Sequence, residues 1–385
     1  MKKSIVYWSP CLTKVGTMKS TLNSSISLAK YSKNCEVTIL NVFGEWTKFE
    51  KYLKENNVIL KNLTFDYYDL LPKKGFIKSR LSYVLIFLIS AIPLFIYIRK
   101  TKPDYLIIHL ITSLPLFLLN FFRMKTKVIL RISGYPKLNF LRKKLWLISQ
   151  NKISKITCPT EQLRDDLIKN NIFKEEKVTT LFDAIINIRE FIKKKKEIEK
   201  GKPKIIFDEF FLAAGRFTRQ KNFIYLIREF AKFIKSNPNE KLLIIGEGEL
   251  KKKMQEEIDK LNLFNNIKIL EYTDNIYYFM KNSKSFILTS IWEEVGFVIV
   301  EASFCNSFII SSNCKNGPDE FLQNGRAGLI FRSNIRDELF KKLLEYKKLD
   351  KNQIFKKKLL SKKNCTKFTM FSHFLKLNCI INENY

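Results

Sequence analysis

The sequence predicts an α/β protein built from two doubly wound domains, each a parallel sheet covered by helices. Short apolar runs alternate with helical patterns along most of the chain, and this alternation is typical of parallel sheets. The alternation breaks once, between Asp183 and Lys204, in a lysine-rich stretch without an apolar period, which indicates a linker. The length of 385 residues is sufficient for two domains of ordinary size.

The expected elements follow in order from the apolar runs. In the first half, strands are expected at residues 4–8, 36–41, 58–65, 104–109, 127–132, 154–158 and 177–182. The chain then divides into a first domain at 1–183, a charged linker at 184–204, a second domain at 205–349 and a helical tail at 350–385. Packing of the tail on the first domain is one option. Two doubly wound domains that face each other place their ligand in the cleft, at the carboxyl ends of the strands.

Two glutamates, Glu293 and Glu301, stand eight positions apart where a loop is expected to run into a helix. The backbone N–H groups between them would be the unpaired donors of the helix start, and such donors bind anions. Glycine at this point lets an anion approach the backbone closely. The pattern predicts a phosphate site flanked by carboxylates that accept hydrogen bonds from sugar hydroxyls; an ordinary amphipathic helix with solvated glutamates is the alternative. The donor-binding residues expected here are Glu301, Gly296, Phe297 and Val298.

A second group of candidate residues lies upstream. The apolar run 211–214 ends at Gly215 and Arg216, and Lys221 stands where a helical pattern begins. Arginine offers a planar fork to phosphate oxygens, and lysine near a helix start adds a point charge. The two cations are therefore candidates to clamp a diphosphate, although two ordinary surface cations would give the same pattern in a basic chain. Gly246, in the turn after an apolar run, is a further candidate, but no third glycine completes a dinucleotide fingerprint.

Together these segments resemble the E-x7-E and G-R-x4-K signatures of the retaining glycosyltransferases of family 4, from about Phe211 to Phe331. The resemblance implies the glycosyltransferase B-type fold and transfer of a sugar from a nucleotide-diphosphate sugar with retention of anomeric configuration. Uridine diphosphate is favoured over guanosine diphosphate as the nucleotide. The resemblance also implies that Arg216, Lys221 and Glu293 act in catalysis, that Glu301 binds the ribose, and that neither a metal nor another cofactor is needed.

The first domain offers fewer candidate residues. Gly16 and Thr17 follow the first expected strand, where members of the family often have two glycines in contact with donor phosphate or acceptor; only one glycine is present here. His109 and Ser133 each follow a middle strand, and the family commonly places a histidine there, near the reacting centre. His109 is expected to be either this catalytic histidine or a buried residue with its hydrogen bonds satisfied.

The chain is strongly basic, with 69 lysines and arginines against 37 aspartates and glutamates and a formal net charge of +32. Such a surface attracts nucleic acid, anionic lipid or phosphorylated ligands. Residues 140–148 form a basic amphipathic pattern with Trp146 as an expected interfacial anchor. Because the apolar stretch 81–98 is close to the shortest helix that spans a bilayer, about 17 residues, we expect it to be buried or to lie at an interface. The basic residues that flank this stretch are Lys73, Lys74, Lys78, Arg80, Arg99, Lys100 and Lys102.

The remaining composition favours a reduced, cytoplasmic protein. Met1 is followed by only a short apolar run, so no secretory signal is expected. Seven cysteines without a C-x-x-C pair argue against a disulfide framework or a structural zinc, and two histidines are too few for a histidine-rich metal site. No Asp-x-Asp occurs, which removes the usual metal-diphosphate ligand pair of the other large glycosyltransferase fold. We expect a peripheral position on the inner face of the cell membrane, on anionic lipid.

The function expected from these features is transfer of a sugar to a saccharide acceptor, linked to a lipid, in the assembly of surface polysaccharide or lipopolysaccharide. Two alternatives stay open. A nucleic-acid-binding protein would use the same positive charge, but no recognised nucleic-acid module appears and no nucleic-acid partner is expected. A nucleotide-sugar epimerase or a phosphorylase could use the same fold, because a fold alone does not determine function.

Overall fold

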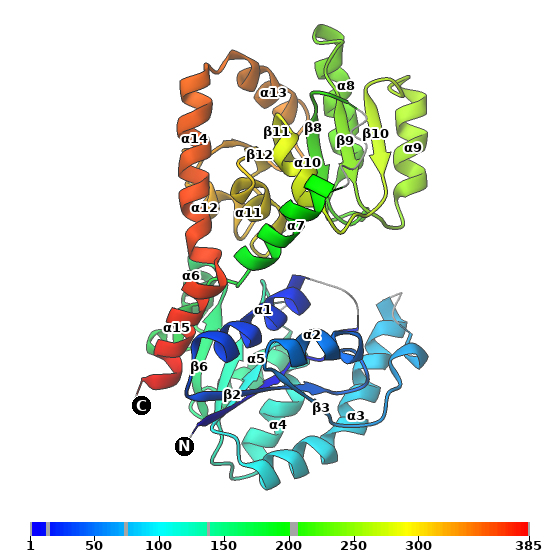
Figure 1. Ribbon diagram of the computed structural model, residues 1–385. Helices are drawn as coiled ribbons and strands as arrows, with labels where there is room; N and C mark the ends of the chain where they lie inside the picture. Colours follow the sequence, from blue (N-terminus) through cyan, green and yellow to red (C-terminus); the bar gives the residue numbers. More distant parts are fainter. Residues whose placement is uncertain (1, 13–15, 73–75, 137–138, 201–206, 384–385) are drawn as a thin grey trace. The chain divides into compact units, whose positions relative to one another are not determined.

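The computed structural model describes residues 2–12, 16–72, 76–136, 139–200 and 207–383. The chain forms two compact units (Figure 1). Unit 1 comprises Met1–Ile185 and Met370–Tyr385, and unit 2 comprises Ile186–Thr369. Each unit contains one parallel sheet with helices packed on it. The predicted α/β class with two Rossmann-like units is therefore confirmed.

The sheet of unit 1 has seven strands in the order β3-β2-β1-β4-β5-β6-β7. The strands are β1 Lys3–Trp8, β2 Cys35–Asn41, β3 Ile59–Asn62, β4 Tyr105–Ile108, β5 Lys127–Arg131, β6 Ile153–Cys158 and β7 Val178–Thr180. The helices are α1 Gly16–Tyr31, α2 Glu50–Glu55, α3 Phe76–Thr101, α4 Ser113–Phe121, α5 Phe140–Ser149, α6 Glu161–Lys169 and α15 Met370–Asn382. The strand order reverses between β1 and β4, and sheets of this kind bind ligands at such a point.

Strand β1 shows why this sheet is buried on both faces. Side chains alternate between the two faces of a strand. Ile5 and Tyr7 pack into the core that also contains residues of α1 and α15, whereas Val6 and Trp8 pack into the core beside α3 and α4. A continuous apolar run is therefore what a central parallel strand requires.

The last helix, α15, belongs to unit 1 although it follows unit 2 in sequence. It lies against α1, where the rings of Phe374 and Tyr31 are 5.5 Å apart. His373 is buried at this contact: its Nε2 lies 2.8 Å from the Ser24 hydroxyl and its Nδ1 lies 2.6 Å from the Phe182 carbonyl oxygen. The end of the chain thereby becomes part of the core of unit 1.

The structure bears on two segments that we expected near a membrane, the apolar stretch 81–98 and the helix that contains Trp146. Within the described residues, α3 is long and apolar enough to cross a membrane by length and composition, over Arg80–Thr101. Lys73 and Lys74 lie outside the described residues, as does the side chain of Lys78. Trp146 in α5 is not the interfacial anchor that we expected. It is 4% exposed, and its ring centroid lies 5.3 Å from that of Phe173, because α5 turns this side chain into the core.

The sheet of unit 2 has six strands in the order β10-β9-β8-β11-β12-β13, with the reversal between β8 and β11. The strands are β8 Phe211–Ala214, β9 Leu242–Ile245, β10 Ile267–Leu270, β11 Ser285–Leu288, β12 Phe308–Ser312 and β13 Leu329–Phe331. The helices are α7 Ile188–Lys200, α8 Phe223–Ser236, α9 Lys251–Lys260, α10 Ile276–Asn282, α11 Phe297–Phe304, α12 Pro318–Phe321, α13 Glu338–Lys348 and α14 Lys351–Asn364.

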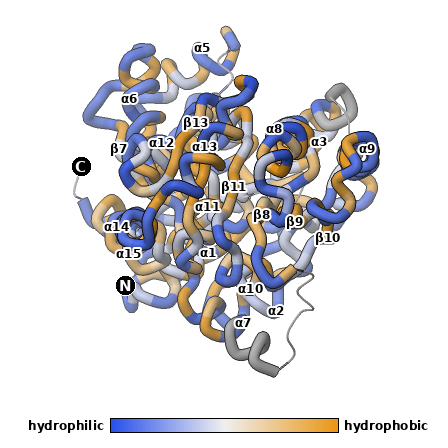
Figure 2. Tube along the Cα trace, turned by 90° about the horizontal axis from the view of Figure 1, so that it is seen from above, coloured by the Kyte–Doolittle hydropathy of each residue, from blue (hydrophilic) through white to orange (hydrophobic). Residues whose placement is uncertain are grey.

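Phenylalanine side chains fill much of the core of unit 2. Phe211 of β8 meets Phe230 and Phe233 of α8 edge to face, with ring centroids less than 6 Å apart. The apolar residues of α8 recur at helical spacing and are buried, as the sequence pattern indicates. Figure 2 shows the resulting mixture of hydrophobic and hydrophilic residues along α8 and α9.

The unit boundaries differ from the predicted ones in two places. The segment 184–204, expected to be a linker, contains the helix α7, which begins at Ile188. The ring of Phe191 in α7 packs 5.3 Å from Tyr277 and 4.8 Å from Phe304, so this part of the segment belongs to unit 2. The tail divides at Met370, with α14 in unit 2 and α15 in unit 1.

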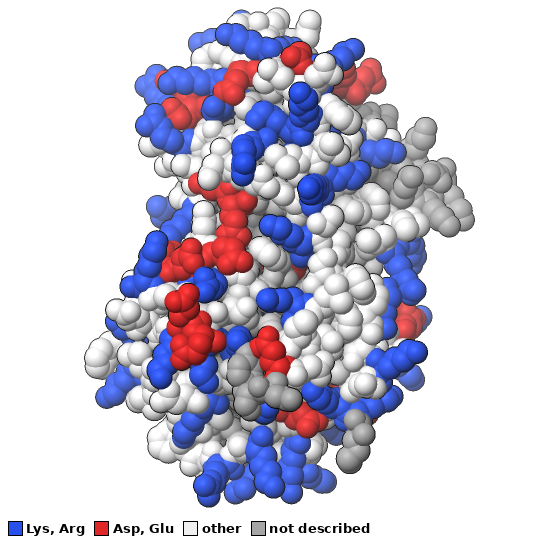
Figure 3. All heavy atoms as spheres, turned by 90° about the vertical axis from the view of Figure 1, so that its left-hand side faces the viewer, with Lys and Arg blue, Asp and Glu red and all other residues white. Residues whose placement is uncertain are grey.

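Positive charge is spread widely over the surface. On the face drawn in Figure 3, lysine and arginine side chains occur over most of the surface, and aspartate and glutamate form smaller groups between them. A reader of nucleic acid usually orders its basic residues along one element. No such order is visible on this face.

Candidate functional site

The candidate site of unit 2 lies at the carboxyl ends of β8 and β11, the two neighbouring strands between which the strand order reverses. The loop after β8 carries Gly215, Arg216 and Lys221, and the loop after β11 carries Glu293 and ends at Gly296. Parallel strands present their carboxyl ends at the same edge of a sheet, which brings the two sequence motifs together. The two motifs, which are far apart in the sequence, therefore lie next to each other in the fold.

The loop after β8 is held in place by backbone bonds and by one buried ring. The amide of Gly215 donates to the carbonyl oxygen of Ile245 at 3.0 Å, and the amide of Phe217 donates to the backbone carbonyl oxygen of Glu247 at 2.7 Å. The Phe217 side chain is fully buried. Arg216, between these anchors, is exposed and forms no ion pair with any described residue. Its guanidinium is therefore available to an anionic ligand.

Gly246 lies directly beneath this loop. Its φ is +156°, and a Cβ on this residue would lie 1.9 Å from the Gly215 carbonyl oxygen. Only glycine fits such an approach. The structure gives Gly246 a packing role that positions Gly215 and Arg216, while direct contact of Gly246 with a ligand stays a prediction.

Lys221 and Glu293 are in direct contact. The Lys221 Nζ lies 2.6 Å from Glu293 Oε1, and the two side chains are 12% and 9% exposed. Ser290 donates a second hydrogen bond to the same carboxylate oxygen at 2.5 Å. The lysine therefore neutralises the carboxylate in this structure, in addition to the role we predicted for it at a phosphate.

Backbone contacts join the two loops around this ion pair. The amide of Ile291 donates to the carbonyl oxygen of Gln220 at 2.8 Å, and the Gln220 side chain donates to the Trp292 carbonyl oxygen at 2.9 Å. Thr289 donates to the Lys221 carbonyl oxygen at 2.8 Å. These bonds fix the distance between the lysine and the glutamate before any ligand binds.

The N-terminus of α11 follows the Glu293 loop, as predicted. Gly296 is its N-cap with φ +77°, and no side chain caps the helix there. One of the expected donors is already used, because the Ile299 amide donates to the Gly296 carbonyl oxygen at 2.9 Å. This correction leaves the amides of Phe297 and Val298, both in partly exposed residues, as the candidate anion donors.

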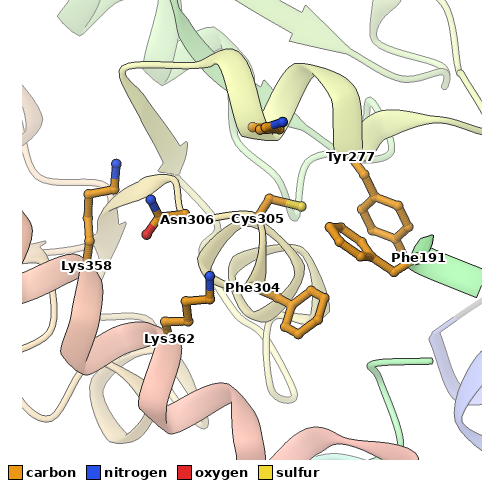
Figure 4. A pocket seen from close by; sticks show the side chains of 8 residues that line it. Phe191, Tyr277, Phe304, Cys305, Asn306, Lys358 and Lys362 are labelled. Atoms are coloured by element: carbon orange, nitrogen blue, oxygen red, sulfur yellow. The ribbon is translucent and has the colours of Figure 1, made fainter. Parts of the chain in front are cut away.

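Glu301 occupies the next turn of α11 and is 8% exposed. The Tyr277 hydroxyl lies 3.5 Å from its Oε1. Beside this pair is a cavity of about 340 Å³ with aromatic and basic walls (Figure 4). The cavity is lined by Phe191, Tyr277, Lys281, Phe304, Cys305, Asn306, Lys358 and Lys362. Tyr277 therefore connects the predicted ribose carboxylate to a neighbouring hollow in the same unit.

The remaining predicted residues lie in unit 1. Gly16 and Thr17 are the first residues of α1, and Thr17 is buried. Ser133 follows β5, and its hydroxyl is buried without a hydrogen-bond partner among the described residues. These positions agree with the strand ends that we expected, and their contact with a ligand stays a prediction.

His109 follows β4 and is buried. Its Nδ1 lies 3.3 Å from the Thr21 hydroxyl, and its ring is 6.0 Å from that of Tyr7. Burial, with a smaller contribution from the Arg131 guanidinium, lowers the pKa of His109 well below its usual value. The imidazole is therefore neutral at pH 7, and any contact with a reacting group would be through a neutral ring.

Several polar residues of both units were not predicted. Ser290 and Tyr277 contact the two glutamates of the motif, and both lie in segments that follow or precede apolar strands. In unit 1, Arg131 donates to Asp183 at 2.6 Å, and Ser20 also bonds to this carboxylate. The position of Ser290 after the strand 285–288 could have identified it, whereas nothing in the sequence pairs Arg131 with a residue 52 positions away.

No group of three or more His, Cys, Asp or Glu side chains that could hold a metal ion occurs in the part of the chain that the structure describes. The seven cysteines are unpaired thiols. Arg216 and Lys221 are the cations predicted at the diphosphate site.

Comparisons with known proteins point to one family. Residues 188–359 match the family model for glycosyl transferases group 1. The chain is 44% identical over 126 residues to an uncharacterized glycosyltransferase of Methanocaldococcus jannaschii, which covers 32% of this chain and 31% of that protein. It is 26% identical over 247 residues to the N-acetylgalactosamine-N,N'-diacetylbacillosaminyl-diphospho-undecaprenol 4-alpha-N-acetylgalactosaminyltransferase of Campylobacter jejuni, covering 61% of this chain and 65% of the relative.

The match thus spans about a third of the first relative's length and somewhat under two thirds of the second's. The fold is similar over its whole length to the crystal structure of a glycosyltransferase from Rickettsia africae. The TM-score is 0.77 at 18% sequence identity, with all of both chains covered. This likeness agrees with the predicted two-domain glycosyltransferase fold.

Proposed function

We propose that this chain, whose residues 188–359 match the family model for glycosyl transferases group 1, moves a sugar from a nucleotide-diphosphate sugar to a saccharide acceptor. The observation that carries the proposal is the local site of unit 2. An exposed arginine, a lysine–glutamate pair and a helix start without a side-chain cap all follow the carboxyl ends of two neighbouring strands there. This combination suits a pyrophosphate with a sugar attached.

The residues take different roles in the proposed reaction. Arg216, Lys221 and the amides of Phe297 and Val298 stabilise the charge that develops on the leaving phosphate. Glu293, held by Lys221 and Ser290, accepts hydrogen bonds from hydroxyls of the transferred sugar. The acceptor hydroxyl approaches from the side on which the nucleotide diphosphate leaves, so the anomeric configuration is retained.

The Lys221–Glu293 pair gives this mechanism a specific feature. A free lysine would bind phosphate but would leave the nearby carboxylate to repel it. Since Lys221 already contacts Glu293 at 2.6 Å, the carboxylate is partly neutralised when the diphosphate arrives. The proposed reaction needs no metal, because the positive charge comes from these side chains and from the helix N-terminus.

Glu301 and Tyr277 are proposed to hold the nucleoside. A carboxylate at the first turns of α11 is placed to accept hydrogen bonds from ribose hydroxyls, and the Tyr277 hydroxyl orients it. We propose uridine as the base, following the family resemblance. The His109 imidazole of unit 1 is proposed to approach the donor sugar as a neutral ring.

The acceptor is proposed to be a lipid-linked saccharide. The Campylobacter relative is named for an acceptor on diphospho-undecaprenol, and this chain has the basic surface that a diphosphate lipid in an anionic membrane favours. The proposed place of the protein is the cytoplasmic face of the cell membrane, in the assembly of surface polysaccharide or lipopolysaccharide.

Binding of uridine diphosphate tests the site directly. Calorimetric titration of the wild-type chain should show saturable binding, and Arg216→Ala should weaken it. Loss of a charge-assisted hydrogen bond costs about 1.5–3 kcal/mol, which is roughly ten- to a hundredfold in Kd. The matched control is Arg336→Ala, which removes an exposed arginine of the same unit. Equal affinity of Arg216→Ala and the control would remove Arg216 from the site.

A further inference from the structure

One side of α3 presents an uninterrupted apolar stripe to the surface of unit 1. Its large side chains recur every three to four residues, which places them on one face of the helix. Leu88 and Ile92, at the middle of the stripe, are 65% and 70% exposed. The stripe consists of Leu81, Val84, Leu85, Leu88, Ile92 and Ile96. Exposed apolar surface of this extent normally marks a binding surface.

The opposite side of α3 is part of the protein core. Ser82, Ile86 and Ser90 are fully buried, and Leu94 and Ile98 continue the same row with at most 2% exposed. The Ser90 hydroxyl bonds back to the Ile86 carbonyl oxygen, so this face is closed to outside partners. A helix with one face in the core and one apolar face outside is fixed along the surface of the unit.

The stripe continues onto α4. Phe117, Phe121 and Phe122 are 41%, 69% and 39% exposed. The rings of Phe87 and Phe117 are 6.2 Å apart, and those of Phe95 and Phe122 are 4.4 Å apart, so the two helices share one aromatic seam. We name the stripe of α3 together with these three phenylalanines the α3–α4 face.

Cations lie at both ends of the stripe on α3, and neither helix of this face contributes a carboxylate. Arg80 precedes the stripe, and Arg99 and Lys100 follow it, all three exposed. The Arg99 guanidinium lies 5.5 Å from the centre of the Phe95 ring, with its charge next to the apolar seam. Neither α3 nor α4 contains an aspartate or glutamate. The combination of exposed apolar residues with cations at both ends complements an anionic lipid surface.

We propose that the α3–α4 face enters the interfacial layer of an anionic bilayer, with α3 lying along the membrane surface. Leu88 and Ile92 then reach the acyl chains while Arg80, Arg99 and Lys100 contact lipid phosphates. The inference deepens the proposed function, because a lipid-linked acceptor is presented in such a membrane. A second copy of this chain is a weaker occupant, since it would bring the same cations together without carboxylates to pair them.

Flotation with lipid vesicles tests this inference. Wild-type protein should float with vesicles that contain phosphatidylglycerol and bind less to vesicles of phosphatidylcholine alone. The double substitution Leu88→Ser/Ile92→Ser should lower the bound fraction about tenfold. The matched control is Phe355→Ser/Leu359→Ser on α14 of unit 2, where the exposed fractions are 65% and 58%. All four positions are exposed, so the variants should keep the wild-type melting temperature.

The following results would overturn the inference. Equal flotation of the two double variants would show that the α3–α4 face does not carry binding. A concentration-dependent dimer in solution that the Leu88→Ser/Ile92→Ser variant loses, without wild-type flotation, would assign the face to a second copy. Release of vesicle-bound protein by alkaline carbonate is the expected result for a helix lying along the surface, whereas retention would mean that α3 spans the bilayer.

The flotation result is independent of the nucleotide site. Uridine diphosphate affinity in solution should be the same for Leu88→Ser/Ile92→Ser and for the wild-type chain. If the wild-type chain floats but binds no nucleotide, the proposed function fails and the membrane surface stands. If it binds nucleotide but does not float, the membrane surface fails alone.

Discussion

Lys221 and Glu293 form the contact on which the proposed donor site depends. Each is mostly buried, and an unpaired charge at such a position is costly. The E-x7-E and G-R-x4-K motifs had placed both residues at a ligand, but they could not show that the residues bind each other. The two residues pair because β8 and β11 are neighbours in the sheet, and the spacing of the motifs in the sequence does not reveal this.

Gly246 gives a residue-scale prediction about stability. A Cβ at Gly246 would meet the Gly215 carbonyl oxygen at 1.9 Å, and backbone cannot move away as a side chain can. Gly246→Ala should therefore lower the stability of unit 2 by several kcal/mol, about the cost of other severe steric errors in a core. Urea unfolding followed by circular dichroism measures this loss.

Gly325→Ala is the control for the Gly246 substitution. Gly325 has φ +90°, but a Cβ there would have no neighbour within 4 Å. Only the conformational strain of positive φ remains, about 1 kcal/mol. If both variants lose the same stability, backbone conformation rather than the contact with Gly215 explains the glycine.

At the scale of elements, continuous apolar runs were the most reliable signal. The runs at 4–8 and 36–41 correspond to β1 Lys3–Trp8 and β2 Cys35–Asn41, because a strand buried on both faces needs apolar residues throughout. The helix α7 was not predicted, since its run of lysines leaves little apolar pattern beside Phe191, whose ring packs against Tyr277 of unit 2. Trp146 was misread for a related reason: sequence gives the amphipathic pattern of α5, but tertiary packing decides which side faces the core.

Helix α15 carries a prediction about pH. Burial lowers the pKa of His373 to about 4, whereas in the unfolded chain the imidazole titrates near 6.5. The unfolded state therefore binds more protons as the pH falls from 6.5 to 4, and stability decreases over that range. The free energy of unfolding lost through His373 alone is about 3 kcal/mol at pH 4 and below.

Urea unfolding of the wild-type chain and of His373→Asn at pH 7, 5.5 and 4.5 checks this expectation. The variant should be less stable at pH 7, because it loses the contacts with Ser24 and Phe182. Its stability should then change less between pH 6.5 and 4.5. Parallel pH profiles for the two proteins would show that His373 is not the titrating group. His109, whose pKa is also lowered by burial, remains in both proteins, and His373 itself makes a small contribution to lowering the His109 pKa.

At the scale of the whole molecule, the chain combines a segment at 188–359 that matches the model for glycosyl transferases group 1 with a first unit that bears the α3–α4 face. Sequence reasoning predicted the two Rossmann-like units because alternation of strands and helices determines this architecture. It did not divide the tail between the units, although α14 is lysine-rich and α15 is mostly apolar, because only tertiary contacts assign each helix to its unit. The large positive charge, which alone would also suit nucleic acid, suits the proposed diphosphate donor and the proposed anionic membrane.

Release of uridine diphosphate from its sugar conjugates tests the central claim most directly. The chain is incubated with a panel of uridine-diphosphate sugars and a short lipid-linked saccharide in the presence of EDTA, and nucleotide release is followed together with the anomeric configuration of the product. The account predicts acceptor-dependent release with retained configuration, reduced about 10²–10³-fold in Glu293→Gln. An inverted product, or release that is the same in Glu293→Gln as in the wild-type chain, would contradict it.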